Sequence, residues 1–151
     1  MRHAEAKPGA QMDSERGLTS EGRDTAEQMA GFMRRQIGRV DIVISSPFAR
    51  ALETAEIMAR ELGAHVATTA LLEPNRKPKE AWAEIERLAQ QSQDVLVVGH
   101  HPEIGQLIDH IAGVSGISHS FAHGSIAFVI DVQAVDKSQG RSRAVRRNTL
   151  D

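Results

Sequence analysis

The fold is indicated most clearly by residues 40–50, which read VDIVISSPFAR. Residues 40–45 form a short, nearly continuous apolar run that is rich in β-branched side chains. Such a run is typical of a strand buried in a parallel sheet. Ser46-Pro47 predicts a helix start with proline at the first helical position. The helix is expected from about residue 48 to 62, because apolar residues recur there every three to four positions. Arg50 is thereby predicted in the first turn of a helix that directly follows a buried strand.

The same alternation of strands and helices extends outward from this stretch. Apolar periodicity and stop signals predict helices at about 20–37, 80–91 and 104–112, and strands at 65–68, 95–98 and 125–132. Such alternation predicts an α/β fold, a three-layer α/β/α sandwich with a mostly parallel sheet. We expect one domain over residues 1–133 and a polar, basic C-terminal tail over residues 134–151.

Composition narrows the class of protein. The chain has 151 residues, the size of one ordinary domain, and a formal net charge of -2, so no general attraction to nucleic acid or anionic lipid is expected. It has no cysteine, which excludes disulfides, thiolate zinc sites and a cysteine nucleophile. No apolar run approaches the length of a membrane span. We therefore expect a cytoplasmic protein with neither nucleic acid nor a membrane among its partners.

Arginines and histidines stand where strands are predicted to end. Arg2-His3 follows the stub of a first strand, and Gly99-His100 follows the strand at 95–98. Ligands of open α/β sheets bind at the carboxyl ends of the strands, so these side chains are expected to converge with Arg50. Arginine forks and a helix N-terminus suit phosphate oxygens. A histidine among such cations can be held neutral and is then a nucleophile towards phosphorus. Each pattern alone is common, and only their ordered combination predicts a phosphoryl site.

Five motifs in order resemble one known family. They are residues 2–6 (RHAEA), 16–23 (RGLTSEGR), 45–55 (SSPFARALETA), 97–102 (VVGHHP) and 123–127 (HGSIA). Together they resemble the histidine phosphatase, or phosphoglycerate-mutase-like, superfamily, and within it the small SixA phosphohistidine phosphatases. The resemblance runs from residue 1 to about 132 and covers nearly the whole domain.

The resemblance implies a role for each candidate residue. His3 would be the nucleophile that becomes transiently phosphorylated, Arg2 and Arg50 would bind phosphoryl oxygens, and His100 would donate a further hydrogen bond to them. Arg16 is a candidate contact at the mouth of the site, although a salt bridge at the rim is equally expected. His123 is a further candidate for the phosphate pocket. No cofactor is implied. The pairs His100-His101 and His119 with His123 could suggest zinc ligands, but adjacent ring nitrogens rarely converge on one ion, so we expect no metal site.

The acid that would protonate a leaving group is weakly indicated. Glu73, in the sequence LLEP, lies in the right region, but a surface role for it is the stronger expectation. A site without a strong acid favours phosphohistidine, because a protonated imidazole leaves readily. We therefore predict a metal-independent phosphohistidine phosphatase that acts on a phosphorylated signalling or phosphotransfer protein. The alternatives are a phosphatase of small phosphate esters or anhydrides with the same nucleophile, and a non-catalytic phosphate- or partner-binding domain.

The start of the chain departs from the family pattern. Family members carry several apolar residues before the Arg-His motif, whereas only Met1 precedes Arg2 here. We expect a shortened first strand that places His3 beside the strand at 95–98. A natural chain that starts upstream of Met1 is a further expectation.

Overall fold

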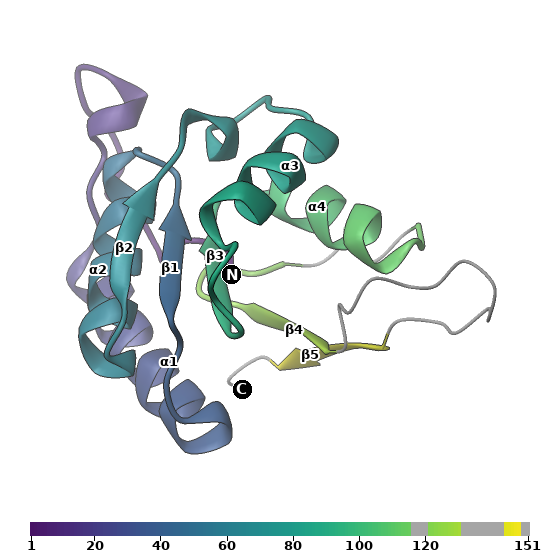
Figure 1. Ribbon diagram of the computed structural model, residues 1–151. Helices are drawn as coiled ribbons and strands as arrows, with labels where there is room; N and C mark the ends of the chain where they lie inside the picture. Colours follow the sequence, from purple (N-terminus) through teal and green to yellow (C-terminus); the bar gives the residue numbers. More distant parts are fainter. Residues whose placement is uncertain (116–120, 131–143, 149–151) are drawn as a thin grey trace, which may run out of the picture.

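The computed structural model describes residues 1–115, 121–130 and 144–148. Helices and strands alternate along most of this chain (Figure 1). Their bounds are η1 Asp13–Glu15, α1 Ser20–Ile37, β1 Ile42–Ser45, α2 Ala49–Leu62, β2 His65–Thr68, η2 Ala70–Leu72, α3 Pro78–Leu88, β3 Val95–Val98, α4 Glu103–Ala112, β4 Ile126–Ile130 and β5 Ala144–Asn148. None of the described helices is long and apolar enough to cross a membrane.

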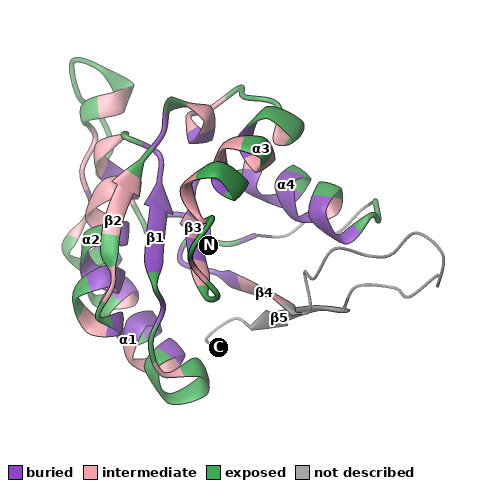
Figure 2. Cartoon of the chain, viewed as in Figure 1, coloured by how far each residue is buried: buried purple, intermediate pink, exposed green. Residues whose placement is uncertain are grey.

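The central sheet has the strand order β2-β1-β3, and both pairings are parallel. Ser45 at the end of β1 lies opposite Thr68 and Val98, so all three strands end at the same edge. Helices α1 and α2 cover one face of the sheet, and α3 and α4 cover the other (Figure 1). Strand β1 is buried throughout, between two apolar clusters (Figure 2). The predicted α/β fold with a mostly parallel sheet is confirmed.

Residues 1–3 extend this sheet beside the end of β3. The amino group of Met1 donates to Val97 O at 2.6 Å, Gly99 N donates to Met1 O at 3.1 Å, and His3 N donates to Gly99 O at 3.0 Å. On the other side Arg2 N donates to Ser125 O at 3.0 Å. The parallel contact between Arg2 and Gly99 is an isolated bridge rather than a full strand. The first strand is therefore short, and His3 lies next to the end of β3 as expected.

The loop between His3 and α1 is closed at its base. Ala6 and Leu18 form an antiparallel bridge, and Lys7 N donates to Gly17 O at 2.9 Å. Gly22 in α1 lies so close to Glu5 that an added Cβ would come within 2.2 Å of the Glu5 carbonyl oxygen, which only glycine permits. The loop of residues 7–17, with η1 at its far end, is thereby held over the carboxyl edge of the sheet.

Two helix boundaries differ from the sequence prediction. Helix α2 begins at Ala49, so Pro47 precedes the helix instead of opening it. The reason is that Phe48, with φ -62° and ψ 135°, is extended and forms the N-cap, so the helical backbone begins one residue later. Helix α3 begins at Pro78, with the proline in its first turn, and ends at Leu88 rather than near residue 91.

The C-terminal region contains a second, two-stranded sheet. Strands β4 and β5 pair antiparallel, with Ile126 opposite Asn148 and Ile130 opposite Ala144. Part of the segment that we expected to be a tail, residues 134–151, thus forms a strand, while the rest of it lies outside the described residues. The division into a domain over 1–133 and a tail stays a prediction.

Candidate active site

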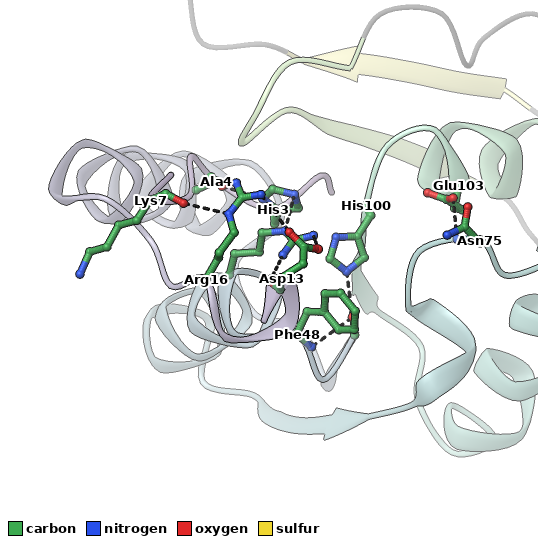
Figure 3. Close-up of polar contacts among 11 residues, drawn as sticks. His3, Ala4, Lys7, Asp13, Arg16, Phe48, Asn75, His100 and Glu103 are labelled. Carbon is green, nitrogen blue, oxygen red and sulfur yellow. Dashed lines mark hydrogen bonds and ion pairs between the residues drawn. The ribbon is translucent and has the colours of Figure 1, made fainter. Parts of the chain in front are cut away.

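Three histidine rings gather at the carboxyl edge of the central sheet. The ring centroid of His3 lies 5.2 Å from that of His100 and 5.4 Å from that of His123. Arg50 Nε lies 3.3 Å from His3 Nε2, and Arg2 Nη2 lies 2.9 Å from His123 Nε2. Residues far apart in the sequence are thus brought together as the strand-end rule predicted, and His123 belongs to the same cluster. Figure 3 shows His3 and His100 side by side.

The contacts of His3 determine which ring nitrogen carries its proton. His3 Nδ1 lies 2.7 Å from Ala4 O, and a carbonyl oxygen can only accept, so Nδ1 is the donor (Figure 3). Arginine can only donate, so its contact from Arg50 Nε requires a lone pair on His3 Nε2. Both contacts assign the same tautomer. His3 therefore presents an unprotonated Nε2, the atom that a nucleophile needs.

The surroundings of His3 keep its ring neutral. The side chain is only 6% exposed, and burial, together with the nearby His100 and Arg50, lowers the pKa of His3 from 6.5 to about 3. Burial and the charge of Arg50 likewise lower the pKa of His100 from 6.5 to about 4. Both rings are neutral near pH 7, and the Nε2 lone pair of His3 is available across the physiological range.

Arg50 is buried beneath the loop of residues 7–17 and is paired with Asp13. Its Nη1 donates to Asp13 O at 2.8 Å, and its Nη2 donates to Asp13 Oδ2 at 3.0 Å. The other oxygen, Asp13 Oδ1, accepts from Arg16 Nη1 at 2.9 Å. The two arginines lower the pKa of Asp13 despite an opposing effect of burial. The Asp13 carboxylate thus binds the guanidinium of Arg50, which was predicted to hold phosphate. Arg16 is connected to the site by its ion pair with the same carboxylate.

The sequence analysis missed Asp13 because its partner Arg50 is 37 residues away. The only local signal is the spacing of Asp13 and Arg16, three residues apart, which indicates an ordinary ion pair on one turn. Arg16 also donates from Nε to Lys7 O at 2.9 Å, which ties it to the base of the loop (Figure 3).

Arg2 is held at the opposite side of the histidine cluster. Its Nη1 donates to Phe121 O at 2.5 Å, and its Nη2 donates to His123 Nε2. Its Nε is buried and has no hydrogen-bond partner among the described residues. Burial lowers the pKa of His100 and of His123, and the positive charge of Arg2 lowers both further, so it adds to the positive potential of the cluster.

His100 is supported by Ser46 and Phe48. His100 Nε2 lies 2.9 Å from Ser46 Oγ, and the ring of Phe48 meets the histidine ring edge-on at 5.2 Å between centroids. The opposite ring nitrogen, Nδ1, is buried and has no hydrogen-bond partner among the residues that the structure describes. Sequence reasoning interpreted Ser46 only as part of a helix start and so missed this contact.

Glu73 lies near the cluster without joining it. Its carboxylate accepts from Arg76 Nη2 at 2.8 Å, and its charge raises the pKa of His100 slightly against the larger lowering effects. The loop around it is attached to α4, because Asn75 N donates to Glu103 Oε1 at 2.8 Å (Figure 3). Glu73 is therefore close enough to influence the site electrostatically, but its carboxylate pairs with Arg76 rather than with His3.

Three further histidines were considered as zinc ligands or as residues at the rim of the site. His101 and His110 are exposed, and His119 lies outside the described residues. Within the described part of the chain, no group of three or more histidine, aspartate or glutamate side chains is placed to hold a metal ion.

Comparisons of the sequence and of the fold with known proteins identify one family. The model of the histidine phosphatase superfamily (branch 1) matches residues 1–75. Phosphohistidine phosphatase SixA of Escherichia coli (strain K12) is 32% identical over 111 residues, which are 72% of this chain and 69% of that protein. An uncharacterized protein of Picosynechococcus sp. is 33% identical over 103 residues, covering 66% of this chain and 62% of that one. The solved structure of the protein histidine phosphatase SixA complexed with tungstate has a TM-score of 0.76 and 30% identity, covering 85% of this chain and 84% of that one.

The resemblance indicated by the sequence motifs is confirmed by these matches. The chain belongs to the histidine phosphatase superfamily and is a SixA-like phosphatase.

Proposed function

We propose that this phosphatase hydrolyses phosphohistidine on a phosphorylated protein, without a metal ion and through a phospho-His3 intermediate. The observation that carries the proposal is the assigned tautomer of His3, whose unprotonated Nε2 lies 3.3 Å from the guanidinium of Arg50. A neutral, buried imidazole with its lone pair beside an arginine fork is suited to attack a phosphorus atom whose oxygens are bound by that fork.

The proposed reaction has two displacement steps. His3 Nε2 forms a bond to phosphorus while the P–N bond of the substrate breaks, and the departing imidazole takes its proton from solvent. Water then attacks phosphorus in phospho-His3, the His3–P bond breaks, and inorganic phosphate leaves with Nε2 unprotonated again. Charge grows on the phosphoryl oxygens in both steps, so Arg2, Arg50 and the His100 ring would stabilise both transition states.

Phosphohistidine is favoured over other substrates because none of the described carboxylic acids is clearly placed to protonate a leaving group. Glu73 is paired with Arg76 and stays a weak candidate for that role. An imidazole leaving group needs less help than an alkoxide does. The similarity to SixA of Escherichia coli, whose name describes a phosphohistidine phosphatase, supports the same choice. We propose a phosphotransfer or signalling protein as partner and the cytoplasm as location; the latter rests on composition alone.

We expect a phosphohistidine protein or peptide to turn over faster than phosphoserine, phosphotyrosine and sugar phosphates, and to do so equally with and without a chelator. Released phosphate measured across this panel tests the proposal. Activity that is lost with chelator and restored by a divalent ion would contradict the metal-free mechanism. Equal turnover of alkyl esters would favour the small-ester alternative and make Glu73→Gln the next variant to measure. If no substrate turned over, the result would favour the remaining alternative, a non-catalytic phosphate- or partner-binding domain.

Removal of the Asp13 charge is expected to strengthen anion binding. A phosphoryl group that binds Arg50 must displace the Asp13 carboxylate, and breaking such a half-exposed ion pair costs up to about 1 kcal/mol. Asp13→Asn should therefore bind tungstate or inorganic phosphate more tightly, by up to about 5-fold, measured by calorimetry. Glu15→Gln removes the same charge from an exposed neighbour in η1 and should leave the affinity unchanged. Equal or weaker binding by Asp13→Asn would show that Asp13 does not compete with phosphate.

A further inference from the structure

The Nδ1 atom of His100 is a buried polar atom that the folded chain leaves without a hydrogen bond. His100 is 3% exposed, and its Nδ1 has no partner among the described residues. Buried ring nitrogens in folded proteins are normally paired, so an unpaired one beside a binding site indicates a group that is reserved for a ligand. The neighbouring ring is that of His3, the proposed nucleophile. This places Nδ1 where it can serve the phosphoryl group.

The position of the proton on the His100 ring decides whether Nδ1 attracts or repels a phosphoryl group. A neutral imidazole carries one N–H, and its other nitrogen is an acceptor. Phosphoryl oxygens are acceptors, so Nδ1 binds them only if Nδ1 carries the proton. If the proton lay on Nε2, the Nδ1 lone pair would face negatively charged oxygens. His100 Nε2 must therefore accept a hydrogen bond from its own neighbour for the ring to act as a donor.

The neighbour of Nε2 is the hydroxyl of Ser46, at 2.9 Å. Ser46 Oγ already accepts from the backbone N–H of Phe48 at 3.3 Å. A hydroxyl has one proton to donate, and among the described residues the contacts of Ser46 Oγ are with Phe48 N and His100 Nε2. If His100 Nε2 were the donor, the fully buried Ser46 hydroxyl would have no acceptor for its proton. Complete hydrogen bonding therefore requires Ser46 to donate.

The serine is held in place by its backbone. Ser46 N donates to Val98 O at 3.1 Å, which fixes the serine against the end of β3. Phe48 packs edge-on against the His100 ring from the same turn. Ring and hydroxyl are thus in a fixed relation before any ligand arrives.

We propose that Ser46 is a positioning residue that donates its hydroxyl proton to His100 Nε2 and so holds the tautomer that presents Nδ1–H to the phosphoryl group. This rests on the proposed function only in naming phosphoryl as the ligand of Nδ1. The tautomer itself is a property of the ligand-free protein. Ser46 has no contact of its own with the ligand in this arrangement and acts through His100.

The test is long-range ¹H–¹⁵N NMR of the histidine rings at pH 7, with the signals of His100 assigned from their absence in His100→Gln. Wild type is expected to show the Nδ1–H tautomer at His100. Ser46→Ala should raise the Nε2–H tautomer and weaken tungstate binding about 3- to 10-fold, since one of several donors to the anion is partly lost. Ser45→Ala is the matched control, because Ser45 is equally buried and its hydroxyl donates to the Ser46 carbonyl rather than to the His100 ring. It should change neither the tautomer nor the affinity.

Three results would overturn the inference: the Nε2–H tautomer in wild type, an unchanged tautomer in Ser46→Ala, or the same shift in Ser45→Ala. The first needs no variant and so does not depend on whether Ser46→Ala folds. Failure of the proposed function is recognised separately. If no phosphohistidine substrate turns over while the NMR results are as expected, the inference holds for an anion-binding site and the proposed reaction is wrong.

Discussion

Replacement of His3 by alanine is expected to abolish labelling of the enzyme by phosphohistidine substrate and to reduce phosphate release to the uncatalysed rate. The reason is that Nε2 of His3 is the unprotonated nitrogen that faces Arg50, and no other ring among the described residues is placed to accept the phosphoryl group in the same way. His100 directs Nε2 at Ser46 instead. The measurement is rapid acid-free quenching with ³²P-labelled substrate, followed by gel autoradiography, because phosphohistidine is lost in acid.

A matched control is His110→Ala, which removes an exposed histidine from α4 and should label like wild type. His3→Ala should still bind tungstate, since Arg2, Arg50 and His100 remain, and this binding shows that the variant is folded. A labelled His3→Ala protein would mean that a different residue, or none, carries the phosphoryl group, and the proposed mechanism would fail.

The main elements of the fold could be predicted because their signals are local. The run from Val40 to Ser45 is apolar and β-branched, and β1 is buried on both faces as that pattern indicates. Helix α1 begins directly after Thr19, a residue type that favours N-caps, and the Thr19 hydroxyl accepts from Gly22 N at 2.9 Å. The convergence of His3, Arg50 and His100 was also predictable, because parallel strands end at one edge of a sheet.

The details that control the site chemistry were not predictable, since they depend on contacts between distant segments. The loop of residues 7–17 has no apolar periodicity, so nothing local places Asp13 against Arg50. Ser46 and His100 are 54 residues apart, and their contact depends on the pairing of Ser46 with β3. The extended backbone of Phe48, which places the start of α2 after Pro47, was likewise not indicated by the sequence. The roles of Glu73 and of each cluster residue in catalysis stay predictions, which the variants described here test.

Replacement of Arg50 by alanine is expected to cost about 2.7–4 kcal/mol of transition-state stabilisation, or about 100- to 1,000-fold in kcat/KM, by analogy with loss of one preorganised donor. The wild-type contacts place the effect at the upper end of that range. Arg50 is 6% exposed, lies against His3 Nε2, and neutralises the Asp13 carboxylate. Without Arg50, that carboxylate would remain near the site, where it would repel a phosphoryl dianion. Steady-state kinetics and tungstate calorimetry measure the loss, and Arg60→Ala, at an exposed arginine of the same helix, is the matched control.

The double variant Arg50→Ala with Asp13→Asn separates the two contributions. If Arg50 acts both as phosphoryl donor and as partner of Asp13, the second substitution should recover part of the lost tungstate affinity, because it removes a negative charge that Arg50 no longer balances. Contacting residues are expected to show such non-additivity, typically about 0.5–3 kcal/mol. The melting temperature of each variant shows whether it is folded when its affinity is measured. Additive losses would mean that Asp13 leaves the site once Arg50 is gone. An Arg50→Ala protein that binds tungstate as tightly as wild type would mean that the guanidinium does not hold the phosphoryl group, and that the arginine serves to anchor the loop of residues 7–17 through Asp13.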